Sequence, residues 1–363
     1  YISLTSDIDL GSVDNWVPIG NDTSIFFGFF NGNDKTISNL KINQNSDYAG
    51  LFGYIKSSGM TASAIPSVEN LKLVDVFVKG NYNVGAIAGK SYTCRISNVH
   101  VTGNVEGVRY VGGISGHVYT YVNDSSYKGD VSGSFDAIGG IAGAGDGRIY
   151  NCTVKGDVTG SNWVGGIIAN GQEGTSVVNC YVEGNVKTTN NYYWGIGGIA
   201  GVAGHGYSSS VIENNYFNGE VYIGEDKANT PVIGIINATD NASIKTAVGG
   251  NSWNTEFYPA ELEIVITADV TNDMSALEYA KSGEKQSRNN NLVMLESDLG
   301  YIDAADASGV TIMNGSTVTE EDVKKAIEYA AQIGAEKYVT LKEAFENAKK
   351  GDSPPLTNKK CVV

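Results

Sequence analysis

Val84-Gly85-Ala86-Ile87-Ala88-Gly89 is the first of five copies of one hexapeptide, and this repeated phrase decides the fold. The other copies are Val111-Gly112-Gly113-Ile114-Ser115-Gly116, Ile138-Gly139-Gly140-Ile141-Ala142-Gly143, Val164-Gly165-Gly166-Ile167-Ile168-Ala169 and Ile196-Gly197-Gly198-Ile199-Ala200-Gly201. Successive copies start 27, 27, 26 and 32 residues apart. A nearly fixed period of this length is the signature of a solenoid, in which each repeat forms one turn and packs on its neighbours.

A second phrase recurs with the same period and centres on an asparagine or aspartate. An apolar residue stands two positions before it, a glycine five positions after it and a valine seven positions after it. Asn and Asp are favoured at corners and turns. Their side chains can also bond the backbone and the equivalent side chain one turn away. We therefore expect a structural role for Asn98, Asp124, Asn151, Asn179 and Asn214.

The segments between these phrases are short and apolar, and no amphipathic helical pattern occurs before residue 270. Residues 1–258 are therefore predicted to be all-β and to fold as a right-handed parallel β-helix with about 27 residues per turn. The residue after each corner is mostly apolar and should point inward. Cys152 and Cys180 hold that position in consecutive turns. We expect buried free thiols there, because stacked parallel side chains seldom reach the torsion of a disulfide.

The composition changes near residue 258, since residues 259–363 hold only 6 of the 46 glycines. This C-terminal segment is predicted to be α+β, with one helix beginning at Thr319 and another at Thr340. Each helix has a single apolar stripe that must pack on something. The segment therefore either caps the solenoid or forms a small separate domain.

Charge and hydropathy exclude two classes of partner. The formal net charge is -15 and the chain has only four arginines, whereas binding to phosphate backbones requires clustered Lys or Arg, so we expect no nucleic acid partner. No apolar run is long enough to span a bilayer, so we expect no direct membrane insertion by this chain. Four scattered cysteines leave the redox compartment open.

Several phrases occur together in one order: Trp16-Val17-Pro18-Ile19-Gly20, Ile37-Ser38-Asn39-Leu40, Gly50-Leu51-Phe52-Gly53 and the glycine hexapeptides. Over roughly residues 1–240 the sequence resembles the GLUG-repeat proteins. The resemblance implies a β-helical repeat region of a bacterial cell-surface or secreted protein, of the type also attached to zinc-dependent IgA1 proteases. It therefore implies an extracellular location. In that family the opening phrase follows further residues, from which we expect a longer parent protein.

The sequence holds no complete catalytic or metal-binding pattern. A zinc protease needs two histidines one helical turn apart with a glutamate beside them, whereas His100, His117 and His205 lie on different turns without that glutamate. We expect no metal, no cofactor and no enzymatic activity. The alternative is a carbohydrate-active enzyme, a polysaccharide lyase or hydrolase on a β-helix. Its carboxylates and basic groups would come from Asp136 and Asp146 with Arg148, or from Glu106 with Arg109.

Aromatic residues precede the glycine phrase in most turns and supply the candidate ligand-binding residues Tyr110, Phe135, Trp163, Tyr193 and Trp194. Rings that face outward could stack on sugars or anchor a protein partner, whereas rings stacked on one another would only stabilise the turns. We expect a non-catalytic adhesion or display module that binds a glycan or a host or bacterial surface protein. A purely structural stalk is the remaining alternative.

Overall fold

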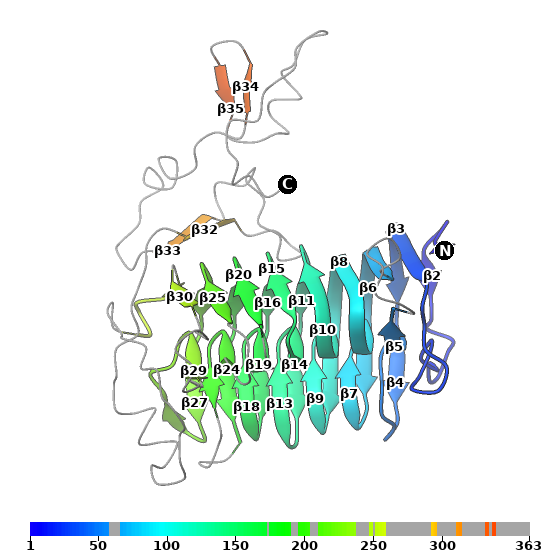
Figure 1. Ribbon diagram of the computed structural model, residues 1–363, viewed down its shortest axis with the longest axis horizontal. Coiled ribbons are helices and arrows are strands. Elements are labelled where there is room, and N and C mark those ends of the chain that lie inside the picture. Colours follow the sequence, from blue (N-terminus) through cyan, green and yellow to red (C-terminus); the bar gives the residue numbers. More distant parts are fainter. Residues whose placement is uncertain are drawn as a thin grey trace.

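The computed structural model describes residues 1–57, 66–172, 174–189, 195–203, 210–236, 247–249 and 251–258, together with four short strands between 292 and 338. The described residues up to 258 form a β-solenoid of about seven turns with no helix, which confirms the all-β prediction. Figure 1 shows the turns stacked side by side, with the N-terminal turn at one end. Strands of neighbouring turns pair in parallel, as the period predicted.

Most strands belong to one continuous sheet. In the first turns they are β1 (Ile2–Ser3), β2 (Ile8–Asp9), β3 (Phe29–Ser38), β4 (Lys41–Asn43), β5 (Phe52–Lys56), β6 (Ser67–Lys79) and β8 (Ala88–Gly107). The middle turns contribute β10 (Ser115–Asn123), β11 (Ser126–Lys128), β12 (Val131–Gly133), β14 (Ala142–Gly145), β15 (Arg148–Tyr150), β16 (Thr153–Lys155), β17 (Val158–Gly160) and β19 (Ile168–Gly171). The last turns contribute β20 (Ser176–Val178), β21 (Tyr181–Glu183), β22 (Val186–Thr188), β24 (Ala200–Ala203), β25 (Val211–Glu213), β26 (Tyr216–Asn218), β27 (Val221–Ile223), β28 (Asp226–Lys227), β29 (Ile233–Ile236), β30 (Ala247–Gly249) and β31 (Ser252–Trp253).

A second sheet is built from the strands that open the glycine hexapeptides. Its members are β7 (Tyr82–Gly85), β9 (Arg109–Gly112), β13 (Asp136–Gly139), β18 (Asn162–Gly165) and β23 (Ile196–Gly197). The chain then reverses sharply and enters the first sheet. At Gly112 an added Cβ would overlap the carbonyl oxygens of Ser115 and Ile141, so the tightness of the reversal explains the repeated glycine.

The repeated Asn and Asp residues lie at a corner with a left-handed backbone. Asn98, Asp124, Asn151, Asn179 and Asn214 have φ between 51° and 55°. Their side chains bond from turn to turn: Asn151 Nδ2 donates to Asp124 Oδ1 at 2.9 Å, and Asn179 Nδ2 donates to Asn151 Oδ1 at 3.4 Å. Asn and Asp therefore serve the corner in two ways: they tolerate its left-handed backbone, and their side chains form a ladder of hydrogen bonds between turns.

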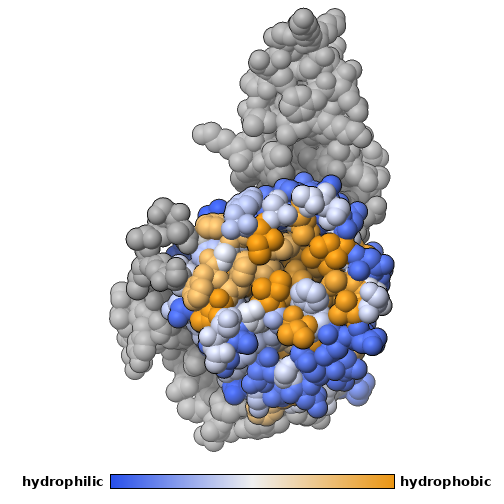
Figure 2. Space-filling view, turned by 90° about the vertical axis from the view of Figure 1, so that its right-hand side faces the viewer, coloured by the Kyte–Doolittle hydropathy of each residue, from blue (hydrophilic) through white to orange (hydrophobic). Residues whose placement is uncertain are grey.

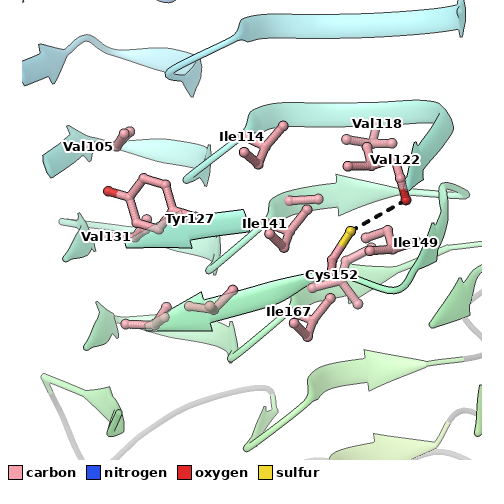
Figure 3. Close-up of a cluster of buried hydrophobic side chains, with 14 of the residues drawn as sticks. Val105, Ile114, Val118, Val122, Tyr127, Val131, Ile141, Ile149, Cys152 and Ile167 are labelled. Atoms are coloured by element: carbon pink, nitrogen blue, oxygen red, sulfur yellow. Dashed lines mark hydrogen bonds between the residues drawn. The ribbon is translucent and has the colours of Figure 1, made fainter. Parts of the chain in front are cut away.

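The interior is filled by columns of equivalent apolar side chains. Figure 3 shows Ile114, Ile141 and Ile167 lying one above another in consecutive turns, with Val122 and Ile149 beside them. All of these side chains are fully buried. Each is expected to contribute about 1.5–3 kcal/mol relative to an exposed side chain, so the repeated columns supply the main stabilisation.

The position after each corner points inward, as predicted, although its occupants change along the rod. It holds Leu40, Leu71 and Val99 in early turns and Ser125, Cys152, Cys180, Asn215 and Asn251 later, and all are buried. Cys152 and Cys180 are free thiols, which confirms that prediction. Asn215 Nδ2 donates to Asn251 Oδ1 at 2.9 Å and Asn251 Nδ2 donates to the Ile212 carbonyl at 2.7 Å, so these buried amides are satisfied.

The N-terminal end of the solenoid presents apolar side chains. Figure 2 faces this end and shows them gathered within a polar rim. Exposed large hydrophobic residues of the first turn include Tyr1, Ile2, Ile8, Val17 and Phe27. Strands β1 and β2 pair only with β3 of the following turn, so their other edge has no partner strand among the described residues.

In the C-terminal segment the structure describes two antiparallel strand pairs. β32 (Leu292–Leu295) pairs with β33 (Val310–Met313), and β34 (Ala331–Ile333) pairs with β35 (Glu336–Tyr338). Residues 331–333, which were expected in the last turn of the helix that begins at Thr319, are extended. The rest of that helix and the helix predicted at Thr340 lie outside the described residues. No helix in the described part of the chain is long and apolar enough to cross a membrane.

Candidate functional site

The predicted aromatic residues lie at a second left-handed corner, directly before the glycine reversal. Tyr110 has φ of 56° and Trp163 has φ of 47°, and the pairing of β9, β13 and β18 places both in one column. Ala137 occupies the turn between them and is fully buried, with both rings packed against it and its neighbouring alanines. The two rings are half-buried, so each keeps an accessible part.

Phe135 lies outside that column but belongs to the same surface. It is 48 % exposed, and the Arg109 guanidinium carbon lies 5.8 Å from its ring centroid. The same guanidinium carbon lies 4.7 Å from the Tyr110 ring, which joins the two aromatics. The other two predicted residues, Tyr193 and Trp194, lie outside the described residues.

A larger group of aromatic and basic side chains begins next to Tyr110. Three neighbouring strand segments of β5, β8 and β10 each present two outward residues, and we call these six residues the tyrosine–lysine grid: Tyr54 and Lys56, Lys90 and Tyr92, His117 and Tyr119. Strand register places Tyr54, Lys90 and His117 in one column and Lys56, Tyr92 and Tyr119 in the other. Two inter-strand spacings make the grid about 10 Å long.

Within the grid each ammonium group faces tyrosine rings. Lys90 Nζ lies 5.4 Å from the Tyr54 ring centroid and 5.6 Å from that of Tyr119. Lys56 Nζ lies 5.3 Å from the Tyr92 centroid. These distances are those of cation–π contacts. The rings of Tyr92 and Tyr119 also approach to 5.3 Å, so the grid is one connected surface.

His117 lies between the grid and the corner aromatics. Its ring is 4.6 Å from that of Tyr119 and 4.8 Å from that of Tyr110. Burial, with smaller effects from Lys90 and Arg109, lowers the pKa of His117 to about 4. The imidazole is therefore neutral at pH 7 and acts as an aromatic spacer.

This depressed pKa makes a prediction about acid stability. The folded protein favours the neutral imidazole, whereas the unfolded chain binds a proton below the ordinary pKa near 6.5. The contribution of His117 to the free energy of unfolding is therefore complete above pH 6.5 and is lost as the pH falls toward about 4. We expect the free energy of unfolding of His117→Gln to fall less between pH 7 and pH 4.5 than that of the unchanged chain, by about 2 kcal/mol. Urea titrations at the two pH values measure this. Equal losses in both proteins would contradict it.

Two of the carboxylates proposed for catalysis, those of Asp136 and Glu106, are engaged in ion pairs. Arg109 Nε lies 2.5 Å from Asp136 Oδ1 in the next turn, and Lys79 Nζ lies 3.0 Å from Glu106 Oε2. Arg148 donates to the Tyr121 hydroxyl at 2.8 Å instead of pairing with Asp136. Burial raises the pKa of Asp136, and Arg109 acts in the opposite direction. Among the described residues no group of three His, Cys, Asp or Glu could hold a metal ion.

The grid residues other than His117 had not been singled out from the sequence. Lys90 and His117 stand six residues after the start of the hexapeptide, and Tyr92 and Tyr119 stand eight residues after it. This shared offset could have indicated from the sequence that these side chains lie side by side in adjacent turns. Tyr54 holds the matching position in the preceding turn but does not show this offset. The phrase before it, Ala49-Gly50-Leu51-Phe52-Gly53, is one residue shorter than the hexapeptide.

The repeats and the turn geometry agree with a family comparison. The model of the GLUG motif matches residues 80–106 and 137–159. The chain carries GLUG repeats. In the structure each matched segment runs from the glycine reversal through the corner that bears Asn98 or Asn151.

Similar proteins share parts of this GLUG region. Halomucin of Haloquadratum walsbyi is 36 % identical over 125 residues, which is 32 % of this chain and 1 % of halomucin. The immunoglobulin A1 protease of Streptococcus sanguinis is 26 % identical over 201 residues, which is 51 % of this chain and 10 % of the protease. A protein described as a Gly-rich membrane protein of Evansella cellulosilytica is 36 % identical over 104 residues, 28 % of this chain and 11 % of that protein. The chain thus spans about a tenth or less of these relatives.

A solved structure supports the fold. The crystal structure of a candidate immunoglobulin A1 protease from Bacteroides ovatus aligns with a TM-score of 0.52 at 24 % sequence identity. The alignment covers 68 % of this chain and 76 % of that chain. At this identity the likeness concerns the solenoid alone.

Proposed function

We propose that this GLUG region is a non-catalytic module of a bacterial surface or secreted protein and that it binds carbohydrate through the tyrosine–lysine grid and the adjacent corner aromatics. The relatives support the location, since one of them is described as a membrane protein and another is an immunoglobulin A1 protease. The part of each relative that aligns with this chain is small, which fits a module attached to other regions.

The connected aromatic surface is the observation that carries the proposal. Aromatic faces bind the apolar faces of sugar rings, and exposed aromatic residues are common interface anchors. Tyr92 is 40 % exposed and Phe135 is 48 % exposed, although neither is needed to fill the core. Stacking between rings would stabilise the turns of a purely structural stalk, but it does not require the exposed surface that Tyr92 and Phe135 keep.

A glycan array tests this function. We expect the intact chain to retain a restricted set of glycans, and the variant Tyr92→Ala/Tyr119→Ala to lose them. Variant Tyr110→Ala/Trp163→Ala tests the corner aromatics in the same way. Phe27→Ala is the matched control, because Phe27 is 48 % exposed but belongs to the first turn. Each variant is first shown to keep the melting temperature of the intact chain within a few degrees.

Two results would contradict the proposal. If the intact chain retains no glycan, carbohydrate binding is wrong and the search moves to protein partners. If glycans are retained equally by all variants, binding occurs elsewhere on the molecule.

A further inference from the structure

We infer that the tyrosine–lysine grid selects acidic carbohydrates, with a sugar ring lying on the tyrosines and its carboxylate or sulfate held by Lys56 and Lys90. This inference rests on the proposed function and adds the chemical class of the ligand. It is carried by the arrangement of charge around the two lysines.

Elsewhere on the solenoid, some lysines have acidic partners in neighbouring turns. Lys79 pairs with Glu106 at 3.0 Å and Lys155 pairs with Glu183 at 3.6 Å. Such pairs follow directly from the parallel register, because each side chain has a neighbour at the same position one turn away. A lysine on this scaffold can therefore obtain a counter-charge from a single residue in the adjacent turn.

The grid lysines have no such ion pair. In the described part of the chain no carboxylate lies within 4.0 Å of either ammonium group, and both ammonium groups lie against tyrosine rings. The two cations are also near enough to affect one another, since burial and the charge of Lys56 lower the pKa of Lys90. An anion bound between the two ammonium groups would offset the repulsion between their positive charges.

The two columns place each cation next to a stacking surface. In each column a lysine stands beside a tyrosine of the adjacent turn, Lys90 beside Tyr54 and Lys56 beside Tyr92. A bound sugar could therefore contact a ring with its C–H face and reach an ammonium group with an acidic substituent. The overall charge of -15 would repel acidic polymers at long range, so selection must come from these local groups.

The decisive experiment compares matched acidic and neutral ligands on the full chain. The first pair of probes is polygalacturonate and its carboxyl-reduced form, which is neutral. The second pair is chondroitin sulfate and its desulfated form, which keeps its carboxylates and so tests the contribution of sulfate alone. We expect polygalacturonate to bind at least about tenfold more tightly than its neutral form, or chondroitin sulfate than its desulfated form, and we expect binding of the more acidic member to weaken as sodium chloride is raised.

A pair of lysine variants locates the site. Lys56→Gln/Lys90→Gln should weaken binding of the acidic probe about tenfold or more and leave the neutral probe unchanged. The matched control Lys41→Gln/Lys128→Gln alters net charge equally at exposed positions outside the grid and should have little effect. Circular dichroism and melting temperature confirm that both variants remain folded.

The outcomes separate this inference from the proposed function. Binding of neutral glycans only, with loss in Tyr92→Ala/Tyr119→Ala, would keep the proposed function and overturn acidic selection. If Lys56→Gln/Lys90→Gln still binds the acidic probe as tightly as the intact chain does, the assigned site is wrong. Absence of any carbohydrate binding would overturn both.

Discussion

Replacing Gly140 with alanine is expected to lower the free energy of unfolding by about 3 kcal/mol. Gly140 is the second glycine of the hexapeptide and lies at the reversal between β13 and β14. An added Cβ would overlap the Gly166 carbonyl oxygen and would meet the two Val154 methyl groups at 2.8 and 2.9 Å. Both neighbours are fixed, one by backbone and the other by the buried core, so neither can move away without cost.

Urea unfolding of Gly140→Ala beside Gly11→Ala measures this effect. Gly11 lies in the exposed first turn, where the nearest atom to an added Cβ is Asp9 Oδ1 at 3.1 Å. We expect that control to change stability by less than about 0.5 kcal/mol. If both variants unfold at the same urea concentration, the close packing of the reversal does not determine its sequence.

Replacing Asn151 with alanine is expected to cost about 3 kcal/mol, and replacing it with glycine about half as much. Asn151 has φ of 53°, donates to Asp124 and accepts from Asn179. Alanine loses these hydrogen bonds and must also hold a left-handed backbone, which is unfavourable for a residue with a Cβ. Glycine loses the same hydrogen bonds but tolerates the backbone.

The difference between the two variants therefore separates conformation from hydrogen bonding at the corner. It is measured as the difference in the free energy of unfolding between Asn151→Ala and Asn151→Gly. Equal losses would assign the whole effect to the side-chain ladder. A larger loss in the glycine variant would contradict the role of the left-handed backbone.

The fold could be predicted because a solenoid repeats its constraints. The first glycine of the hexapeptide recurs at all five reversals, the second recurs at four of them with Ala86 as the exception, and every corner needs a residue that tolerates positive φ. Gly140 and Asn151 therefore belong to phrases that recur with the period of the turn. The inward position after the corner was predictable for the same reason. Helices that begin at Thr319 and Thr340 depend on no such repetition and stay predictions.

The candidate site could be predicted only in part, since a binding surface need not repeat. Tyr110 and Trp163 were found because they share a place in the repeat. Lys90 and His117 also share a place, but they differ in chemistry and their neighbour Tyr54 is displaced by a shortened phrase. Their common surface became visible only when strand register fixed which side chains lie side by side.

The constant parallel register also makes the length of the rod adjustable. In the middle of the solenoid equivalent positions of adjacent turns meet with an offset of 26 to 28 residues, as in Val131 with Val158 and Val158 with Val186. Duplicating or excising one such unit in the gene would create a junction made of the same contacts as every other junction. The rod could thus be lengthened or shortened without forming a new kind of interface, and the proposed tyrosine–lysine grid, which is confined to three turns, would stay unchanged.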